Sequence, residues 1–112
     1  MRFQDDHGVA VPCVKRTESF LERTKGLLGS QELVGGEGLL IIPCNSVHTL
    51  FMQFSIDVVF LDKQSRVNKI VRGMKPFNFA LALRACAVLE LPAGDVDRIG
   101  IVLGQCLLWE EE

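Results

Sequence analysis

The residues best suited to chemistry in this sequence are His48, Asp57 and Glu90. His48 is one of only two histidines, and an imidazole, whose unperturbed pKa lies near ~6.5, can serve as a general base or as a neutral metal ligand. One imidazole and two carboxylates together would form a donor set that suits a divalent cation. The intervals between the three residues match no fixed spacing of metal ligands, so the pattern alone does not establish a metal site.

Each of these residues also has a structural interpretation. His48 would then be a half-buried side chain that is hydrogen-bonded to the backbone. Asp57 opens an apolar strand, where an inward-pointing carboxylate would need a partner because an unpaired buried charge is costly. Arg23 can grip that carboxylate in a bidentate pair, and Thr49 can add a hydroxyl. Glu90 stands between two leucines, so strand alternation turns its side chain to the opposite face, where it would be solvated.

The segment 48–57 mixes these polar residues with apolar ones. Phe51, Met52 and Phe54 stand beside two polar residues, and they would either line an apolar groove or belong to the core. The mixture lacks a recognisable nucleophile, and it predicts the rim of a pocket or groove. The residues predicted to contact a ligand are Arg23, His48, Thr49, Met52, Asp57 and Glu90.

The rest of the sequence predicts the elements that would position this segment. Runs rich in β-branched and aromatic residues predict strands at 9–14, 39–42, 56–62, 66–72, 85–91 and 101–109, with the third and fourth forming a hairpin. The glycines at 35, 36 and 38 predict a turn. Residues 79–87 fit either a helix or an irregular lead-in to a strand, and the strand is favoured only from 85 onward.

Two short helices complete the expected fold. One lies near 20–28, where Ser19 and Glu22 fit a capping box, and the other lies over 95–99 with Asp95 as its cap. The expected fold class is therefore α+β and mainly β, a small curled sheet or partial barrel with two short helices.

The composition limits the class of protein. With 112 residues, 12.4 kDa and 48% hydrophobic residues, the chain fits one compact domain over residues 1–112. A net charge of −2 without any basic run argues against nucleic-acid binding through phosphate neutralisation. No apolar run is long enough to span a membrane and no signal-peptide pattern opens the chain, so we expect a cytoplasmic protein without a membrane partner. The four separated cysteines predict reduced, buried thiols.

Five blocks of sequence occur in a characteristic order: Arg23–Gly29, Gly38–Cys44, Val47–Met52, Ile56–Asp62 and Val88–Gly94. From about Phe20 to Leu107 the chain resembles the bacterial and archaeal domain-of-unknown-function family 192. The resemblance implies a small, β-rich, barrel-like single domain, and it implies no activity because the family has no agreed function. The His48 version of the central block, without a signal, is similar to the cytoplasmic branch. In the family pattern Asp often follows the glycine that corresponds to Gly104, whereas this sequence has Gln105 there.

Two hypotheses about function result. The first is a non-catalytic module without a cofactor, whose 48–57 segment binds a small ligand, a peptide or a protein partner. The alternative is a metal-assisted enzyme, such as a hydrolase, that uses His48, Asp57 and Glu90 as metal ligands or acid–base groups. The identity of the ligand and the oligomeric state stay open at this point.

Overall fold

A computed structural model describes residues 2–5, 10–11, 13–17, 37–49 and 54–110, with side chains at 38–49 and 54–107. The described elements are β1 (Arg2–Asp5), β2 (Ala10–Val11), β3 (Cys13–Thr17), β4 (Glu37–Ile41), β5 (Ser46–His48), β6 (Ile56–Leu61), β7 (Val67–Met74), β8 (Phe79–Leu81), β9 (Ala87–Pro92), α2 (Asp95–Ile99) and β10 (Leu107–Glu110). The mainly β class is therefore confirmed.

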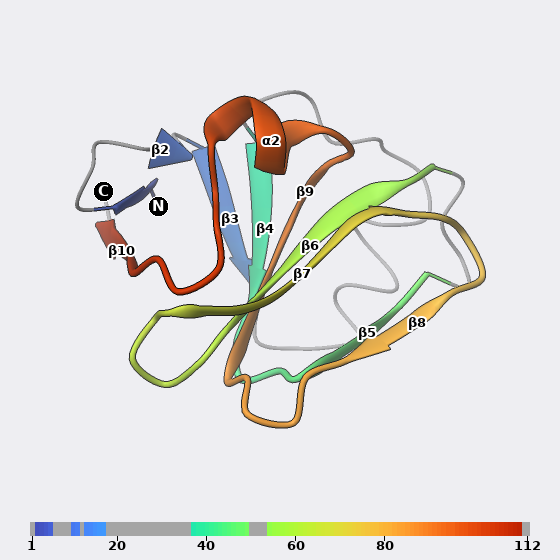
Figure 1. Ribbon diagram of the computed structural model, residues 1–112, viewed down its shortest axis with the longest axis horizontal. Coiled ribbons are helices and arrows are strands. Elements are labelled where there is room, and N and C mark those ends of the chain that lie inside the picture. The colour runs from blue at the N-terminus through green and yellow to red at the C-terminus, as the bar shows by residue number, and fades with distance from the viewer. Residues whose placement is uncertain (1, 6–9, 12, 18–36, 50–53, 111–112) are drawn as a thin grey trace.

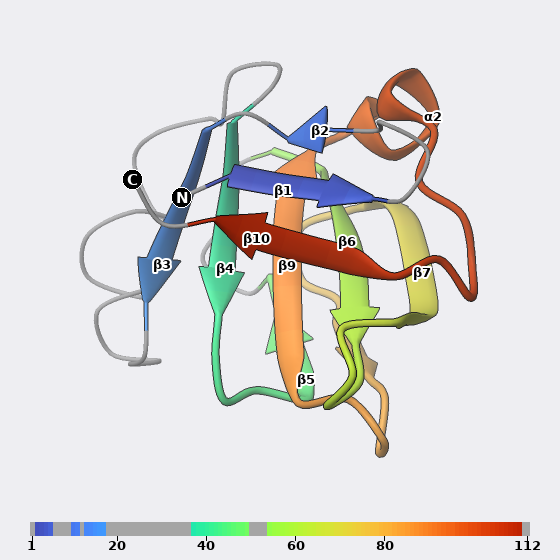
Figure 2. The same ribbon diagram turned by 90° about the vertical axis from the view of Figure 1, so that its left-hand side faces the viewer.

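The described strands form three sheets. A five-stranded sheet in the order β3-β4-β9-β6-β7 is antiparallel except for the parallel pair β3–β4. A three-stranded sheet, β10-β1-β2, crosses one side of it, and the pair β5–β8 lies on the other side (Figures 1 and 2). Each of these sheets has two different edge strands, so the described strands form open sheets and do not close into a barrel.

The central strands are continuously apolar because both of their faces are covered. All six residues of β6 are buried, as are the first five of β9. Alternate residues of these strands enter two separate clusters, so that Val59 and Leu89 join one cluster while Val58 and Val88 join the other. A strand in such a position reads as an unbroken apolar run rather than as an alternating one.

Several expected elements lie where the sequence placed them. The hairpin of β6 and β7 is confirmed, although β7 continues to Met74 instead of ending at 72. β4, β9 and α2 are also confirmed within a few residues of the expected bounds. Gly38 belongs to β4 rather than to a turn, and a Cβ there would lie 3.0 Å from Leu91 Cδ2 and 3.2 Å from Leu89 Cδ1.

Other expectations are wrong. The opening strand at 9–14 is two strands, β2 and β3, in different sheets, and the last strand begins only at Leu107 because residues 102–105 form a turn. β5 and β8 lie where no strand was expected.

The cysteines also differ from expectation. Cys86 is exposed, and Cys44 and Cys106 are half-buried, so these three thiols are not buried as predicted. The expected helix near 20–28 lies outside the described residues.

α2 is the one helix among the described residues, and Asp95 does not cap it. The residue at the N-cap position is Gly94, whose φ of 94° is a left-handed conformation that favours glycine. Glycine has no side chain with which to cap the helix. Asp95 instead accepts two hydrogen bonds from Arg98, at 3.0 and 3.1 Å, and this contact raises the pKa of the Arg98 guanidinium. In the part of the chain that is described, no helix has the length and hydropathy needed to cross a membrane.

Candidate binding site on the outer face of β5 and β8

The pair β5–β8 has one face toward the core and one away from it. Val47 and Ala80 lie opposite each other in the antiparallel register, and both are buried in the cluster between this pair and the five-stranded sheet. His48 lies directly opposite Phe79 on the other face. The outer face of this pair therefore places the histidine singled out by the sequence beside an exposed aromatic ring.

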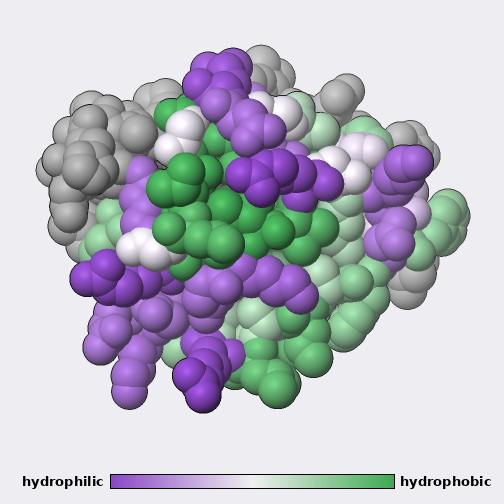
Figure 3. Space-filling view, in the orientation of Figure 1, coloured by the Kyte–Doolittle hydropathy of each residue, from purple (hydrophilic) through white to green (hydrophobic). Residues whose placement is uncertain are grey.

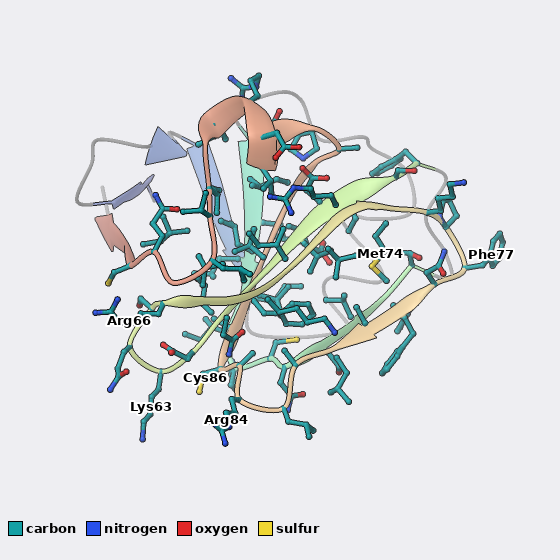
Figure 4. The ribbon with its side chains drawn as sticks, viewed as in Figure 1. Lys63, Arg66, Met74, Phe77, Arg84 and Cys86 are labelled. Atoms are coloured by element: carbon teal, nitrogen blue, oxygen red, sulfur yellow. The ribbon has the colours of Figure 1, made fainter. Side chains whose placement is uncertain are left out.

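Four large apolar side chains are exposed at alternate positions along β8 and its two flanking turns. Phe77 is 76% exposed, Phe79 67%, Leu81 39% and Leu83 80%. We call this set the β8 row. In Figure 4 Phe77 projects from the end of the row, and in Figure 3 hydrophobic surface extends along β8 toward it. Contiguous exposed apolar side chains of this kind mark interaction sites more often than single ones do.

Thr49 fixes the turn that presents Phe77. Its hydroxyl donates to the carbonyl of Lys75 at 2.6 Å and accepts from the backbone N–H of Asn78 at 2.8 Å. The backbone N–H of Phe77 donates to the Thr49 carbonyl at 2.9 Å, and Phe77 has a φ of 63°. A bulky residue in the left-handed region is uncommon. The buried Thr49 is thus a positioning residue for the first member of the β8 row rather than a surface contact.

Basic side chains flank the β8 row. Lys69 donates from Nζ to the Leu81 carbonyl at 2.8 Å and lies 5.8 Å from the centroid of the Phe60 ring. Lys75 and Arg84 are exposed in the turns at the two ends. Residues 63–89 contain six Lys and Arg and no Asp or Glu, although the whole chain has a net charge of −2. The stretch of chain that contains the row is therefore cationic.

Asp57 is buried and holds three segments together. Its Oδ1 accepts from the backbone N–H of Gly73 at 2.8 Å, and its Oδ2 accepts from those of Gly94 at 3.1 Å and Val96 at 2.9 Å. The carboxylate of β6 thus occupies the N-terminus of α2, where backbone donors and the helix dipole favour negative charge. The expected partner, Arg23, lies outside the described residues.

The predicted convergence of His48, Asp57 and Glu90 is not observed. Asp57 lies opposite Leu91 across β6 and β9, one position from Glu90, so the two carboxylates point to opposite faces of the sheet. Glu90 is fully buried instead of solvated, on the same face as Val88. Among the described side chains no three His, Cys, Asp or Glu are grouped closely enough to hold a metal ion. Met52 lies outside the described residues.

The sequence contains a signal for the β8 row that was not recognised. The letters FNFALAL alternate large apolar residues with Asn and Ala, which is the period of a strand. Because alanine is itself apolar, the alternation is hidden in what looks like a continuous apolar run. Large apolar side chains usually face the core, but here the small alanines are buried or half-buried and the large residues are exposed.

Comparison with known proteins places the chain in a family. The family model DUF192, described as "Uncharacterized ACR", matches residues 2–109. The chain belongs to this family. A UPF0127 protein from Thermococcus sibiricus is 30% identical over 105 residues, covering 88% of this chain and 67% of that protein. A UPF0127 protein from Pyrococcus furiosus is 35% identical over 65 residues, covering 57% of this chain and 55% of that protein.

Two solved structures share the fold of this DUF192 member. A protein of unknown function from Novosphingobium aromaticivorans has a TM-score of 0.80 at 23% identity, covering 96% of this chain and 82% of that one. A protein from Sinorhizobium meliloti, described as a candidate transcription regulator, has a TM-score of 0.80 at 20% identity, covering 96% and 89%. At these identities the similarity shows the fold alone.

Proposed function

We propose that this DUF192 member is a non-catalytic binding module that holds a segment of a protein partner on the outer face of β5 and β8. The observation that carries the proposal is the β8 row, because four large apolar side chains at alternate positions of one short segment are exposed. Burying one such side chain contributes about 1.5–3 kcal/mol, so a partner that covers the row gains most of its affinity there.

The positions of the polar residues support binding rather than acid–base chemistry. Asp57 directs both carboxylate oxygens at backbone N–H groups, and Glu90 has no exposed surface. A general acid or base must reach the group whose proton it transfers. His48 is the one of the three on the outer face, opposite Phe79, and we assign it a binding contact.

A peptide-display selection tests the proposal. Immobilised wild-type protein is expected to enrich a set of related peptides, and Phe79→Asp is expected to lose that enrichment because a carboxylate replaces a central apolar contact. Val102→Asp is the matched control, since Val102 is also exposed but lies outside the β8 row. Equal enrichment by Phe79→Asp and wild type would overturn the proposal. Leu83→Asp, at the most exposed position of the row, replaces Phe79→Asp if the latter does not fold.

His48→Ala provides a second test. The variant is expected to keep the thermal midpoint of the wild type within a few degrees, because His48 is half-buried and lies opposite the exposed Phe79, and to bind the selected peptides less tightly. A variant that unfolds would show that His48 is a structural residue instead. The combination of His48→Ala with Phe79→Ala is expected to be non-additive in binding, because the two side chains lie opposite each other.

A further inference from the structure

We infer that the partner segment is acidic and extended, with carboxylates placed beside its apolar residues. This inference rests on the proposed function, and it specifies the chemistry of the partner. The first observation is the unbalanced charge of residues 63–89, which carry six basic side chains and no acidic one in a chain whose overall charge is negative. Complementary charge across an interface favours the matching partner and disfavours others.

Three of these basic residues accompany the β8 row from end to end. Lys75 precedes Phe77 by two residues, Lys69 reaches the backbone at Leu81, and Arg84 follows Leu83. The cations thus lie near the start, the middle and the end of the row. A segment that covers the row with apolar side chains would bring its own flanking groups close to all three.

These three cations are available to a partner. Arg72 lies 3.0 Å from Asp97 and is engaged in that ion pair, and Arg66 donates to the Gly104 carbonyl at 3.1 Å. No carboxylate of the described residues forms an ion pair with Lys69, Lys75 or Arg84. The Lys69 ammonium has three donors and gives one of them to Leu81, so the others can bind a carboxylate.

The shape of the row favours a chain segment over a flat surface. β8 itself covers only Phe79–Leu81, and with the turns that hold Phe77 and Leu83 the row spans at most roughly 20 Å, which suits a short stretch of extended chain. Leu81 is 39% exposed, less than Phe79 at 67% and Leu83 at 80%, so the middle of the row offers less apolar surface than its two ends. A flexible segment can adapt to this uneven exposure more easily than a flat bilayer can.

Defined probes test the inference. Eight-residue peptides with blocked ends and a fluorophore are compared by anisotropy against the full chain: alternating Leu–Glu, alternating Leu–Lys and alternating Ser–Glu. We expect the Leu–Glu peptide to bind at least about tenfold more tightly than either other peptide, because it alone matches both the row and the cations. Vesicles of phosphatidylcholine, with and without phosphatidylglycerol, serve as the membrane probe.

Variants separate the inference from the function on which it rests. Lys75→Glu combined with Arg84→Glu is expected to weaken Leu–Glu binding about tenfold and to strengthen Leu–Lys binding. Lys63→Glu is the control for Lys75→Glu and Arg84→Glu taken singly, since it reverses one positive charge in the β6–β7 turn. Equal binding of the Leu–Glu and Leu–Lys peptides would overturn the inference, and the proposed function would stand if Phe79→Asp abolished both. Binding of phosphatidylglycerol vesicles without any peptide would overturn both proposals, as would no binding of any probe.

Discussion

Asp57 and Thr49 act through the backbone groups that they satisfy. Each lies inside the molecule and bonds to main-chain atoms that are distant in sequence, Asp57 to residues 73, 94 and 96 and Thr49 to residues 75 and 78. Buried donors and acceptors that lose their partners cost free energy. These residues therefore hold loops and turns in place. Substituting them measures how much these hydrogen bonds contribute to the stability of the fold.

Asp57→Asn is expected to lower the free energy of unfolding by about 2–4 kcal/mol, since charge-assisted bonds are lost and the amide NH₂ would face backbone donors. Urea denaturation measures this difference. Asp97→Asn is the control, because the Asp97 side chain is 71% exposed and forms a surface ion pair with Arg72. Loss of this ion pair is expected to lower the free energy of unfolding by no more than about 1 kcal/mol. Similar midpoints for the two variants would contradict the structural role of Asp57.

Thr49→Val is expected to lower stability by about 1–3 kcal/mol, because the shape is kept while the bonds to Lys75 and Asn78 are lost. Faster amide hydrogen exchange at Asn78 would locate the effect in the turn. Thr49→Ser keeps the hydroxyl, so it should restore most of the protection. If both variants protect Asn78 equally, the hydroxyl does not hold the turn.

At the scale of elements, much of the five-stranded sheet could be predicted from sequence, because a strand covered on both faces is a run of β-branched and apolar residues. β6 and β9 are such runs. β5 and β8 could not be predicted in this way, since each has three residues and their pairing depends on contacts across more than thirty residues of chain. The pairing of His48 with Phe79 therefore follows from the tertiary fold and not from a local sequence pattern.

The cap of α2 also depends on a contact that is distant in sequence. A sequence pattern uses only residues close to the start of a helix, and here it favours Asp95. The side chain that caps α2 is Asp57, which lies 37 residues before Gly94. Strand alternation predicts which face Glu90 occupies but not what covers that face, so the expected solvated position is wrong. Tertiary packing, which no local pattern contains, decides both cases.

Gly94→Ala tests the junction between β9 and α2. The left-handed φ of 94° is expected to cost an alanine about 1–2 kcal/mol, and the strain acts where the Gly94 N–H donates to Asp57. The thermal midpoint should fall accordingly. Ala93→Ser, at the exposed neighbouring position, should leave the midpoint unchanged. A Gly94→Ala protein as stable as the wild type would mean that the backbone can relax to a negative φ.

At the scale of the whole molecule, the sheets form layers around two apolar clusters. The cluster on the α2 side draws residues from β4, β6, β7, β9, α2 and β10, so it joins the last strand to the centre of the fold. The other cluster lies between the five-stranded sheet and β5–β8. The candidate binding surface is therefore the outside of a layer whose inside belongs to the core.

Leu107→Ala tests whether the last strand is part of this cooperative unit. Leu107 is fully buried, so truncation is expected to cost about 2–5 kcal/mol in chemical denaturation. Leu103→Ala, at a position 64% exposed, is expected to change stability by no more than about 0.5 kcal/mol. A small effect at Leu107 would indicate that β10 opens separately from the rest of the fold.

The pairing of the first and last described strands also determines how the protein responds to mechanical tension. In the antiparallel ladder of β1 and β10, Arg2 lies opposite Glu110 at one end and Asp5 lies opposite Leu107 at the other. A force that pulls Arg2 and Glu110 apart acts across the ladder rather than along it, so its hydrogen bonds would break one after another, as in a zipper. In a single-molecule pulling experiment through these two positions, β1 and β10 should separate at low force before the five-stranded sheet ruptures.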